Sequence, residues 1–119
     1  MLNKKYRFHS RGGVRYVYQH GKTVRSSKMS LVFVKNARGF TRIVVVVSKK
    51  VMKAAVGRNR IRRRVYEAIR MNFDKIPHGI DYVFVVYSKD VGRMAFGELE
   101  KMISGLISEA EICYNKKNG

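Results

Sequence analysis

The chain has 119 residues and a formal net charge of +18, with 26 Lys and Arg against 8 Asp and Glu. This length fits one domain, residues 1–119, with a single core. An apolar share of 45% argues against pervasive disorder, and no apolar run approaches the roughly 20 residues of a membrane-spanning helix. Because Cys113 is the only cysteine, an internal disulfide and a multi-cysteine zinc site are excluded.

The charge is unevenly distributed along the chain. Residues 1–66 hold 19 Lys and Arg and no acid, whereas residues 67–119 hold 7 Lys and Arg and all 8 acids. A basic domain of this kind can bind nucleic acid, an anionic membrane surface or an acidic protein, and nucleic acid is favoured for a compact one. Because the N-terminus has no apolar stretch of signal-peptide length and cysteine is scarce, we expect a cytoplasmic protein.

The N-terminal third predicts a mobile basic arm followed by a short helix. Residues 1–11 are basic and weakly patterned. Val14, Val17 and Tyr18 then recur at i, i+3 and i+4, which indicates an amphipathic helix that ends at Gly21.

Two strands are predicted next. Residues 29–35 alternate, with Met29, Leu31 and Phe33 on one side. Residues 42–48 contain four consecutive valines, which is typical of a central strand buried on both faces. The short connection between the two runs suggests an antiparallel hairpin.

A helix rich in arginine follows and is expected to start at Arg58 and to end by about Lys75, because Pro77 disfavours helix at the residue before it. Its apolar stripe consists of Ile61, Val65, Ala68 and Ile69. At 100° per residue, the arginines opposite this stripe are Arg60, Arg63 and Arg70, and those flanking it are Arg62 and Arg64.

The rest of the chain predicts a third strand at Tyr82–Tyr87, a final helix with an apolar face from Phe96 to Ile107, and a frayed tail at residues 115–119. The fold class is therefore α+β, an α/β sandwich with one sheet and the order α-β-β-α-β-α. The second strand, the arginine helix and the third strand form a βαβ unit, which the general rule makes right-handed.

The densest chemical feature is a block of five arginines in seven residues that can bind polyphosphate, because a guanidinium holds phosphate oxygens bidentately. The alternative is a solvated basic face. Asn59 could cap the helix, or the basic helix start could bind phosphate. Lys49, Lys50 and Lys53 extend the patch unless they are unrelated surface lysines.

The aromatic residues beside basic ones have two interpretations. Tyr18 and Phe33 could stack on unpaired bases or pack in the core, with core packing favoured for Phe33, and Tyr16 lies off the apolar stripe. The histidines lack matched carboxylates, and no metal-ligand spacing or nucleophile motif stands out. We therefore expect no catalytic residues and no metal site in the protein.

Several segments resemble the bacterial ribonuclease P protein subunit, in the right order and over almost the whole chain. The most specific match is the arginine block after a strand end of sequence Ser-Lys-Lys. The matching segments are Tyr18-Gln19-His20-Gly21-Lys22, Ser48-Lys49-Lys50, Arg58-Asn59-Arg60-Ile61-Arg62-Arg63-Arg64-Val65-Tyr66-Glu67-Ala68-Ile69-Arg70, Gly79-Ile80-Asp81-Tyr82-Val83 and Phe96-Gly97-Glu98-Leu99.

The resemblance implies an accessory subunit of an endoribonuclease that removes the 5′ leader from precursor tRNA. The catalyst would be an RNA subunit that uses Mg²⁺, the protein would pair with it one to one, and the βαβ crossover would be left-handed. The implied residues for binding the RNA subunit are Arg58, Asn59, Arg60, Arg62, Arg63, Arg64, Lys49, Lys50 and Lys53. A cleft between the first helix and the sheet would contact the single-stranded leader, and its implied residues are Tyr18, Phe33, Val14, Arg15 and Tyr16.

The chain departs from the family at two places. Val14 stands where an aromatic residue is usual, so leader stacking would depend on Tyr18 and Phe33. Met52 replaces a usual glycine, and the connection from Lys50 to Arg58 is one residue longer than expected.

Three other functions remain as alternatives from composition and pattern. A structural RNA-binding protein, such as a ribosomal one, has the same charge. A DNA-binding helix–turn–helix is disfavoured because strands flank the arginine helix. A membrane-surface helix is disfavoured because that helix lacks large apolar anchors.

Overall fold

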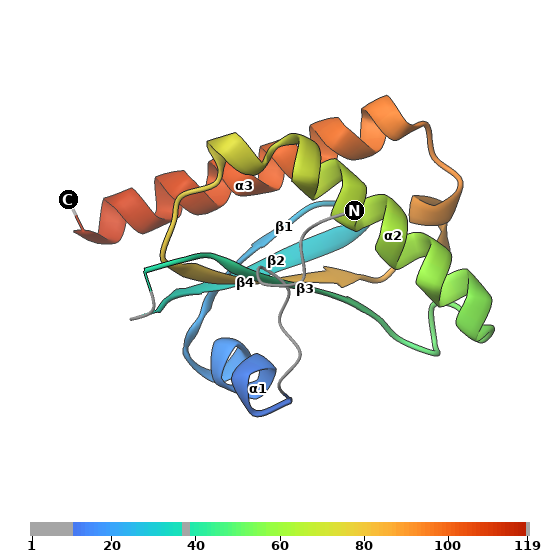
Figure 1. Cartoon of the computed structure of the whole chain (residues 1–119), viewed down its shortest axis with the longest axis horizontal. Coiled ribbons are helices and arrows are strands. Elements are labelled where there is room, and N and C mark those ends of the chain that lie inside the picture. Colours follow the sequence, from blue (N-terminus) through green and yellow to red (C-terminus); the bar gives the residue numbers. More distant parts are fainter. Residues whose placement is uncertain (1–10, 37–38, 119) are drawn as a thin grey trace.

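The computed structural model describes residues 11–36 and 39–118, which form one four-stranded sheet with helices on both faces (Figure 1). The elements in chain order are α1 (Arg11–His20), β1 (Lys22–Arg25), β2 (Met29–Lys35), β3 (Arg42–Val47), α2 (Ala55–Met71), β4 (Ile80–Val86) and α3 (Phe96–Asn118). Two 3₁₀ turns are η2 (Phe73–Lys75) and η3 (Lys89–Gly92). The α+β class with a single sheet is confirmed, but the element order gains a strand.

The additional strand, β1, escaped the pattern analysis because it is short and mostly polar. Its four residues alternate between half-buried and exposed, and Val24 is its only apolar one. Gly21 separates α1 from β1, and a larger residue would clash there. A Cβ at this position would lie 2.5 Å from the carbonyl oxygen of Val17 and 2.8 Å from that of Phe33. The turn therefore brings the start of β1 directly against β2.

The order of the strands corrects the predicted hairpin. The sheet runs β1-β2-β4-β3, with β2 antiparallel and β3 parallel to β4. β4 lies between the two strands that were expected to pair, because its apolar run is buried almost throughout and fits the centre of the sheet. The βαβ unit of β3, α2 and β4 is confirmed, and its left-handed crossover stays a prediction from the resemblance.

The strand with four valines is therefore an edge strand, not a central one. Ile43, Val45 and Val47 are buried against the helices, whereas Val44 and Val46 on the other face are only half-buried. The hydroxyl of Tyr66 accepts a hydrogen bond of 3.2 Å from the Val45 amide. This contact satisfies one amide at an edge where ladder partners are missing.

Most of the core lies between the sheet and the layer of α2 and α3. Leu31, Ile43, Phe84, Ile69 and Ile103 are among its fully buried side chains. α1 covers the opposite face of the sheet (Figure 1). The second core cluster beneath it is small and consists of Val17, Val32 and Val83.

The helix ends differ from the predicted ones by a few residues. α2 begins at Ala55 instead of Arg58 and is followed by η2 before Pro77. α3 continues to Asn118, so residues 115–118 of the expected tail are helical, since neither glycine nor proline interrupts them. Of the predicted basic arm, Arg11 begins α1 and residues 1–10 lie outside the described part of the chain.

Asp81 joins the ends of three strands. This carboxylate, 3% exposed, accepts hydrogen bonds from Arg42 Nε at 2.9 Å and Nη2 at 2.8 Å, and from the Asn36 side-chain amide at 2.7 Å. Arg42 begins β3, and Asn36 follows β2. The bidentate pair with Arg42 fixes β3 on β4, and the bond from Asn36 fixes the end of β2 there.

Candidate nucleic-acid interface

The arginine block lies inside α2 and is oriented by an apolar stripe. Ile61, Val65 and Ile69 are buried against the sheet and α3. Arg60 and Arg63 consequently point to solvent, and Arg62 is half-buried on the flank. We call these three residues the arginine face.

Asn59 does not cap this helix. The N-cap position is Ala54, which makes no side-chain capping bond, and Asn59 lies a full turn further on. Its side-chain oxygen instead accepts a hydrogen bond from Arg62 Nη2. The interpretation of Asn59 as a cap is therefore wrong.

The side chain of Arg58 is hydrogen-bonded to the segment that precedes the helix. Its Nη1 donates to the carbonyl oxygens of Met52 at 3.0 Å and Lys53 at 2.7 Å. Met52 packs on Gly57, where a Cβ would come within 2.6 Å of the methionine Cγ. These contacts hold the segment between β3 and α2 against the helix.

That segment presents three exposed lysines, Lys49, Lys50 and Lys53, which we call the lysine loop. It follows β3 directly and precedes the arginine face by a few residues, so both basic groups lie at the same end of α2. The expected extension of the arginine patch by these lysines is consistent with this placement.

Arg64 is also committed to the protein. Its Nη1 donates to the Val91 carbonyl at 2.7 Å, and its Nη2 donates to the Met94 carbonyl at 2.5 Å. These bonds join α2 to η3 and to the connection between η3 and α3. Although the resemblance assigns Arg64 to RNA, its guanidinium has a structural role here.

The remaining charges of α2 divide clearly. Arg70 donates to Glu67 at 2.5 Å, and this hydrogen bond is the largest of the effects that lower the pKa of Glu67 to about 2. Among the described residues, the side chains of Arg60 and Arg63 make no hydrogen bond or ion pair. Their positive charge is therefore available to a polyanion.

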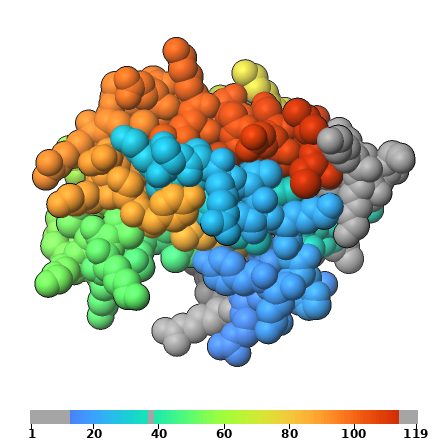
Figure 2. Space-filling view, turned by 180° about the vertical axis from the view of Figure 1, so that it is seen from behind, coloured from blue at the N-terminus to red at the C-terminus, as the bar shows by residue number. Residues whose placement is uncertain are grey.

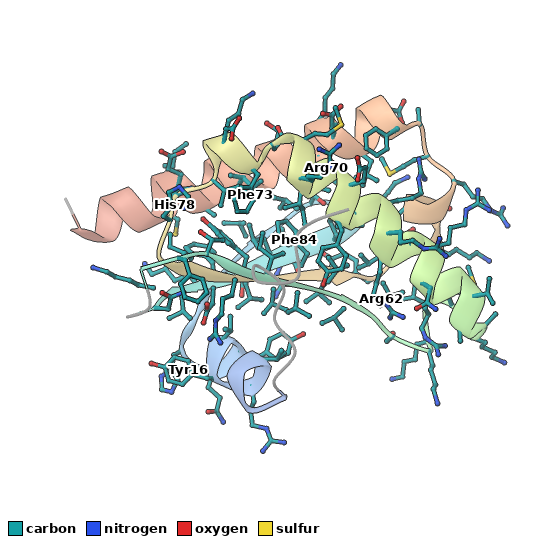
Figure 3. The ribbon with its side chains drawn as sticks, viewed as in Figure 1. Tyr16, Arg62, Arg70, Phe73, His78 and Phe84 are labelled. Atoms are coloured by element: carbon teal, nitrogen blue, oxygen red, sulfur yellow. The ribbon has the colours of Figure 1, made fainter. Side chains whose placement is uncertain are left out.

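The side chains of α1 separate into two flanks around Val17, which is fully buried. At 100° per residue, Val14 and Tyr18 lie on one flank, and Tyr16 lies on the other with His20. The rings of Tyr16 and His20 are 4.4 Å apart, and Tyr16 projects on the side away from Arg62 (Figure 3). Tyr16 is thus removed from the flank that holds Tyr18.

Tyr18 is 47% exposed, and partial burial raises the pKa of its phenol. Val14 is half-buried beside it, and Arg15 is exposed. The side chain of Tyr18 is therefore about half accessible while its helix is anchored by Val17. This arrangement suits stacking on a planar group.

Phe33 has a different position from the one that leader binding would need. Its side chain is 3% exposed and packs in the main core on the face of the sheet that α2 and α3 cover. In β2 it points with Met29 and Leu31, away from α1. The structure thus leaves Phe33 out of the candidate surface and favours the interpretation as a core residue.

The sheet contributes residues that the sequence analysis did not single out. Val44, Val46 and Val85 are half-buried on the face that α1 covers only in part, and we call them the valine floor. The surface is hollowed between α1 and the segment leading into α2 (Figure 2). The four-valine run contained the signal, but it was interpreted as burial on both faces.

Other kinds of site find no support within residues 11–36 and 39–118. This part of the chain has no group of three His, Cys, Asp or Glu residues placed to hold a metal. Its helices are all too short or too polar to cross a membrane. What the described surface offers is two basic groups and, beside α1, a hollow near the exposed Tyr18 and the half-buried valine floor.

Comparison with known proteins identifies the family. A family model for ribonuclease P matches residues 2–111. The ribonuclease P protein component of Clostridioides difficile is 41% identical over 101 residues, which are 82% of this chain and 85% of that protein. That of Roseiflexus castenholzii is 32% identical over 111 residues, 93% of this chain and 90% of that protein.

Solved structures agree with the fold. The ribonuclease P protein of Thermotoga maritima matches with a TM-score of 0.77 and 27% identity, covering 87% of this chain and 96% of that one. The Staphylococcus aureus protein matches with a TM-score of 0.77 over 88% of this chain and 94% of that one, but its identity of 21% supports the fold alone. On the family match and these relatives, the chain belongs to the family of ribonuclease P protein components.

Proposed function

We propose that this protein binds the catalytic RNA of ribonuclease P with its arginine face and lysine loop. The observation that carries the proposal is the division of the arginines, because Arg58 and Arg64 hold the protein together while Arg60 and Arg63 are exposed. Phosphate contacts by exposed arginines supply affinity for RNA and make it depend on salt.

The groove beside α1 would receive the single-stranded 5′ leader of precursor tRNA. Tyr18 supplies a stacking surface that tolerates any base, and the valine floor supplies apolar contact without hydrogen-bond readout. A leader of variable sequence needs this kind of contact. The lysine loop, at the end of β3, lies where the leader backbone could continue towards the arginine face.

In this proposal the RNA subunit performs the hydrolysis with its own Mg²⁺, and the protein binds and orients. One protein would pair with one RNA, in the cytoplasm. The protein's contribution is electrostatic and positional, because bringing the leader and the RNA subunit together lowers the cost of aligning the scissile bond.

The test is cleavage of precursor tRNA at low Mg²⁺ by the ribonuclease P RNA of Clostridioides difficile, with and without this protein. We expect the protein to stimulate cleavage. Absence of stimulation, together with tight binding to unrelated structured RNA, would instead indicate a structural RNA-binding protein.

The leader contact is tested with a matched pair of tyrosine variants. Tyr18→Ala should weaken binding of precursor tRNA to the assembled enzyme about fivefold or more. A fivefold loss corresponds to about 1 kcal/mol, the lower end of the range for loss of one stacked base. Tyr16→Ala, on the opposite flank, should leave the affinity for precursor tRNA unchanged. The two variants should bind mature tRNA, which has no leader, with equal affinity. Equal effects of both variants would contradict the assignment of the groove.

A further inference from the structure

A hollow of about 310 Å³ lies between α2 and the beginning of α3, at the edge of the arginine face. It is lined by Arg63, Arg64, Glu67 and Phe96. The two helices pack against each other in the upper layer of Figure 1. Its volume is at the low end for small-ligand pockets, about 300–1,000 Å³, and it is open to solvent.

We propose that this hollow is a second nucleotide site, in which an unpaired base of the bound RNA stacks on Phe96 while its phosphate contacts Arg63. The site rests on the proposed function, since it presumes that the arginine face meets RNA. It would extend the RNA interface from α2 onto α3 and read a base, whereas the arginine face contacts only backbone phosphates.

The ring of Phe96 is available for this role. It is half-buried, packs against the main core and also lines the hollow. Aromatic rings beside basic side chains are the usual platform for unpaired bases. Core packing alone would explain a buried ring, but not an aromatic surface facing a hollow next to Arg63.

The charges around the hollow favour a base inside it and a phosphate at its rim. Arg63 is exposed and makes no hydrogen bond or ion pair among the described residues. Glu67, whose pKa is lowered to about 2 by Arg70, keeps a negative charge within the hollow. A carboxylate repels phosphate but can accept a hydrogen bond from the amino group of a base.

The hollow is also held in a fixed shape. The bonds from Arg64 to the carbonyls of Val91 and Met94 fix the chain just before Phe96 onto α2. The Ala95 carbonyl then accepts from the amides of Glu98 and Leu99, which starts α3. A preorganised ring loses little entropy when a base stacks on it.

The first experiment uses the absence of tryptophan from the chain. Phe96→Trp places a single indole in the hollow, and its emission is measured as ribonuclease P RNA of Clostridioides difficile is added. We expect quenching on RNA binding but none on addition of inorganic polyphosphate, which offers phosphate without bases. Phe73→Trp is the control, because Phe73 is also half-buried on the core but lies near His78 at the other end of α2 (Figure 3).

The second experiment measures affinity. Phe96→Leu retains apolar packing but removes the aromatic face, so RNA affinity should fall about fivefold or more while its dependence on salt is unchanged. Phe73→Leu should lose a similar amount of thermal stability without losing affinity. Phe96→Tyr should bind as the original protein does.

The outcomes separate this inference from the proposed function. If the protein binds the RNA and stimulates cleavage, but the indole at position 96 is not quenched or is quenched equally by polyphosphate, the base site is wrong and the proposed function stands. If the original protein neither binds the RNA nor stimulates cleavage, the proposed function itself is wrong.

Discussion

Replacing Arg60 and Arg63 together by alanine should weaken RNA binding without destabilising the fold. Both side chains are exposed and make no hydrogen bond or ion pair among the described residues, so their removal leaves no buried group unsatisfied. Arg64→Ala is the matched comparison, because the same substitution one residue further on removes two hydrogen bonds to the carbonyls of Val91 and Met94.

The magnitudes of the two effects follow from the contacts. Two lost phosphate contacts lower the slope of log affinity against log salt by about 1.4–1.8. Over a fourfold rise in salt, the original protein should therefore lose about 7- to 12-fold more affinity than the double variant. Arg64→Ala should cost about 1.5–3 kcal/mol of folding stability, because it removes hydrogen bonds from a charged donor and leaves two carbonyls without it.

The assay is a filter-binding or fluorescence titration of ribonuclease P RNA at several salt concentrations, together with thermal unfolding of each variant. The double variant should change the salt slope and keep its unfolding temperature, and Arg64→Ala should lower the unfolding temperature with a smaller change in slope. The reasoning is refuted if Arg64→Ala lowers the slope as much as the double variant while its stability is unchanged.

Three further predictions concern the fold. Asp81→Asn should lower the free energy of unfolding in urea by about 3 kcal/mol, since the buried carboxylate that pairs with Arg42 is lost, whereas an unchanged midpoint would contradict the role of Asp81 in joining three strands. Gly57→Ala should destabilise the original protein, because the Cβ of the new alanine would meet the Met52 side chain. In a Met52→Gly background the same substitution should stabilise the protein by about 0.5–1 kcal/mol, because alanine favours helix more than glycine does. Equal effects of Gly57→Ala in both backgrounds would rule out the contact with Met52. The hydrogen bond from Arg70 is the main cause that lowers the pKa of Glu67 to about 2. The stability that this pair adds is therefore present above the ordinary carboxyl pKa of about 4.3 and is lost as the pH falls towards 2. Glu67→Gln should make the unfolding temperature depend less on pH in this range.

The sequence predicted the parts of the fold that depend on local periodicity. The stripe from Ile61 to Ile69 placed α2 on the core and correctly set Arg60, Arg63 and Arg70 outward. The alternation in residues 29–35 correctly set Phe33 with Leu31. Both succeed because side-chain direction follows the helical and strand periods alone.

Strand order and the roles of individual arginines could not be predicted in the same way. The pairing of β4 between β2 and β3 depends on contacts across 39 to 45 residues of sequence, such as those of Asp81 with Arg42 and Asn36. The partners of Arg64 are backbone carbonyls 27 and 30 residues away. Because every residue has a backbone carbonyl, the residue types do not show which carbonyls accept a hydrogen bond. The sequence therefore does not distinguish the arginines that bind within the protein from those that are exposed to solvent, and only the fold does.

The distribution of ion pairs explains how a chain so rich in positive charge can keep a basic surface for RNA. In the described part of the chain, three acids form ion pairs, Asp81 with Arg42, Asp90 with Lys28, and Glu67 with Arg70. None of these pairs involves the lysine loop or the arginine face. Within residues 11–36 and 39–118, the side chains of Arg58 and Arg64 pair with no acid and bind carbonyls only, so their charge also adds to the positive potential at this end of α2. The two structural arginines therefore hold the basic surface in shape and strengthen its field, while Arg60 and Arg63 remain to contact phosphate.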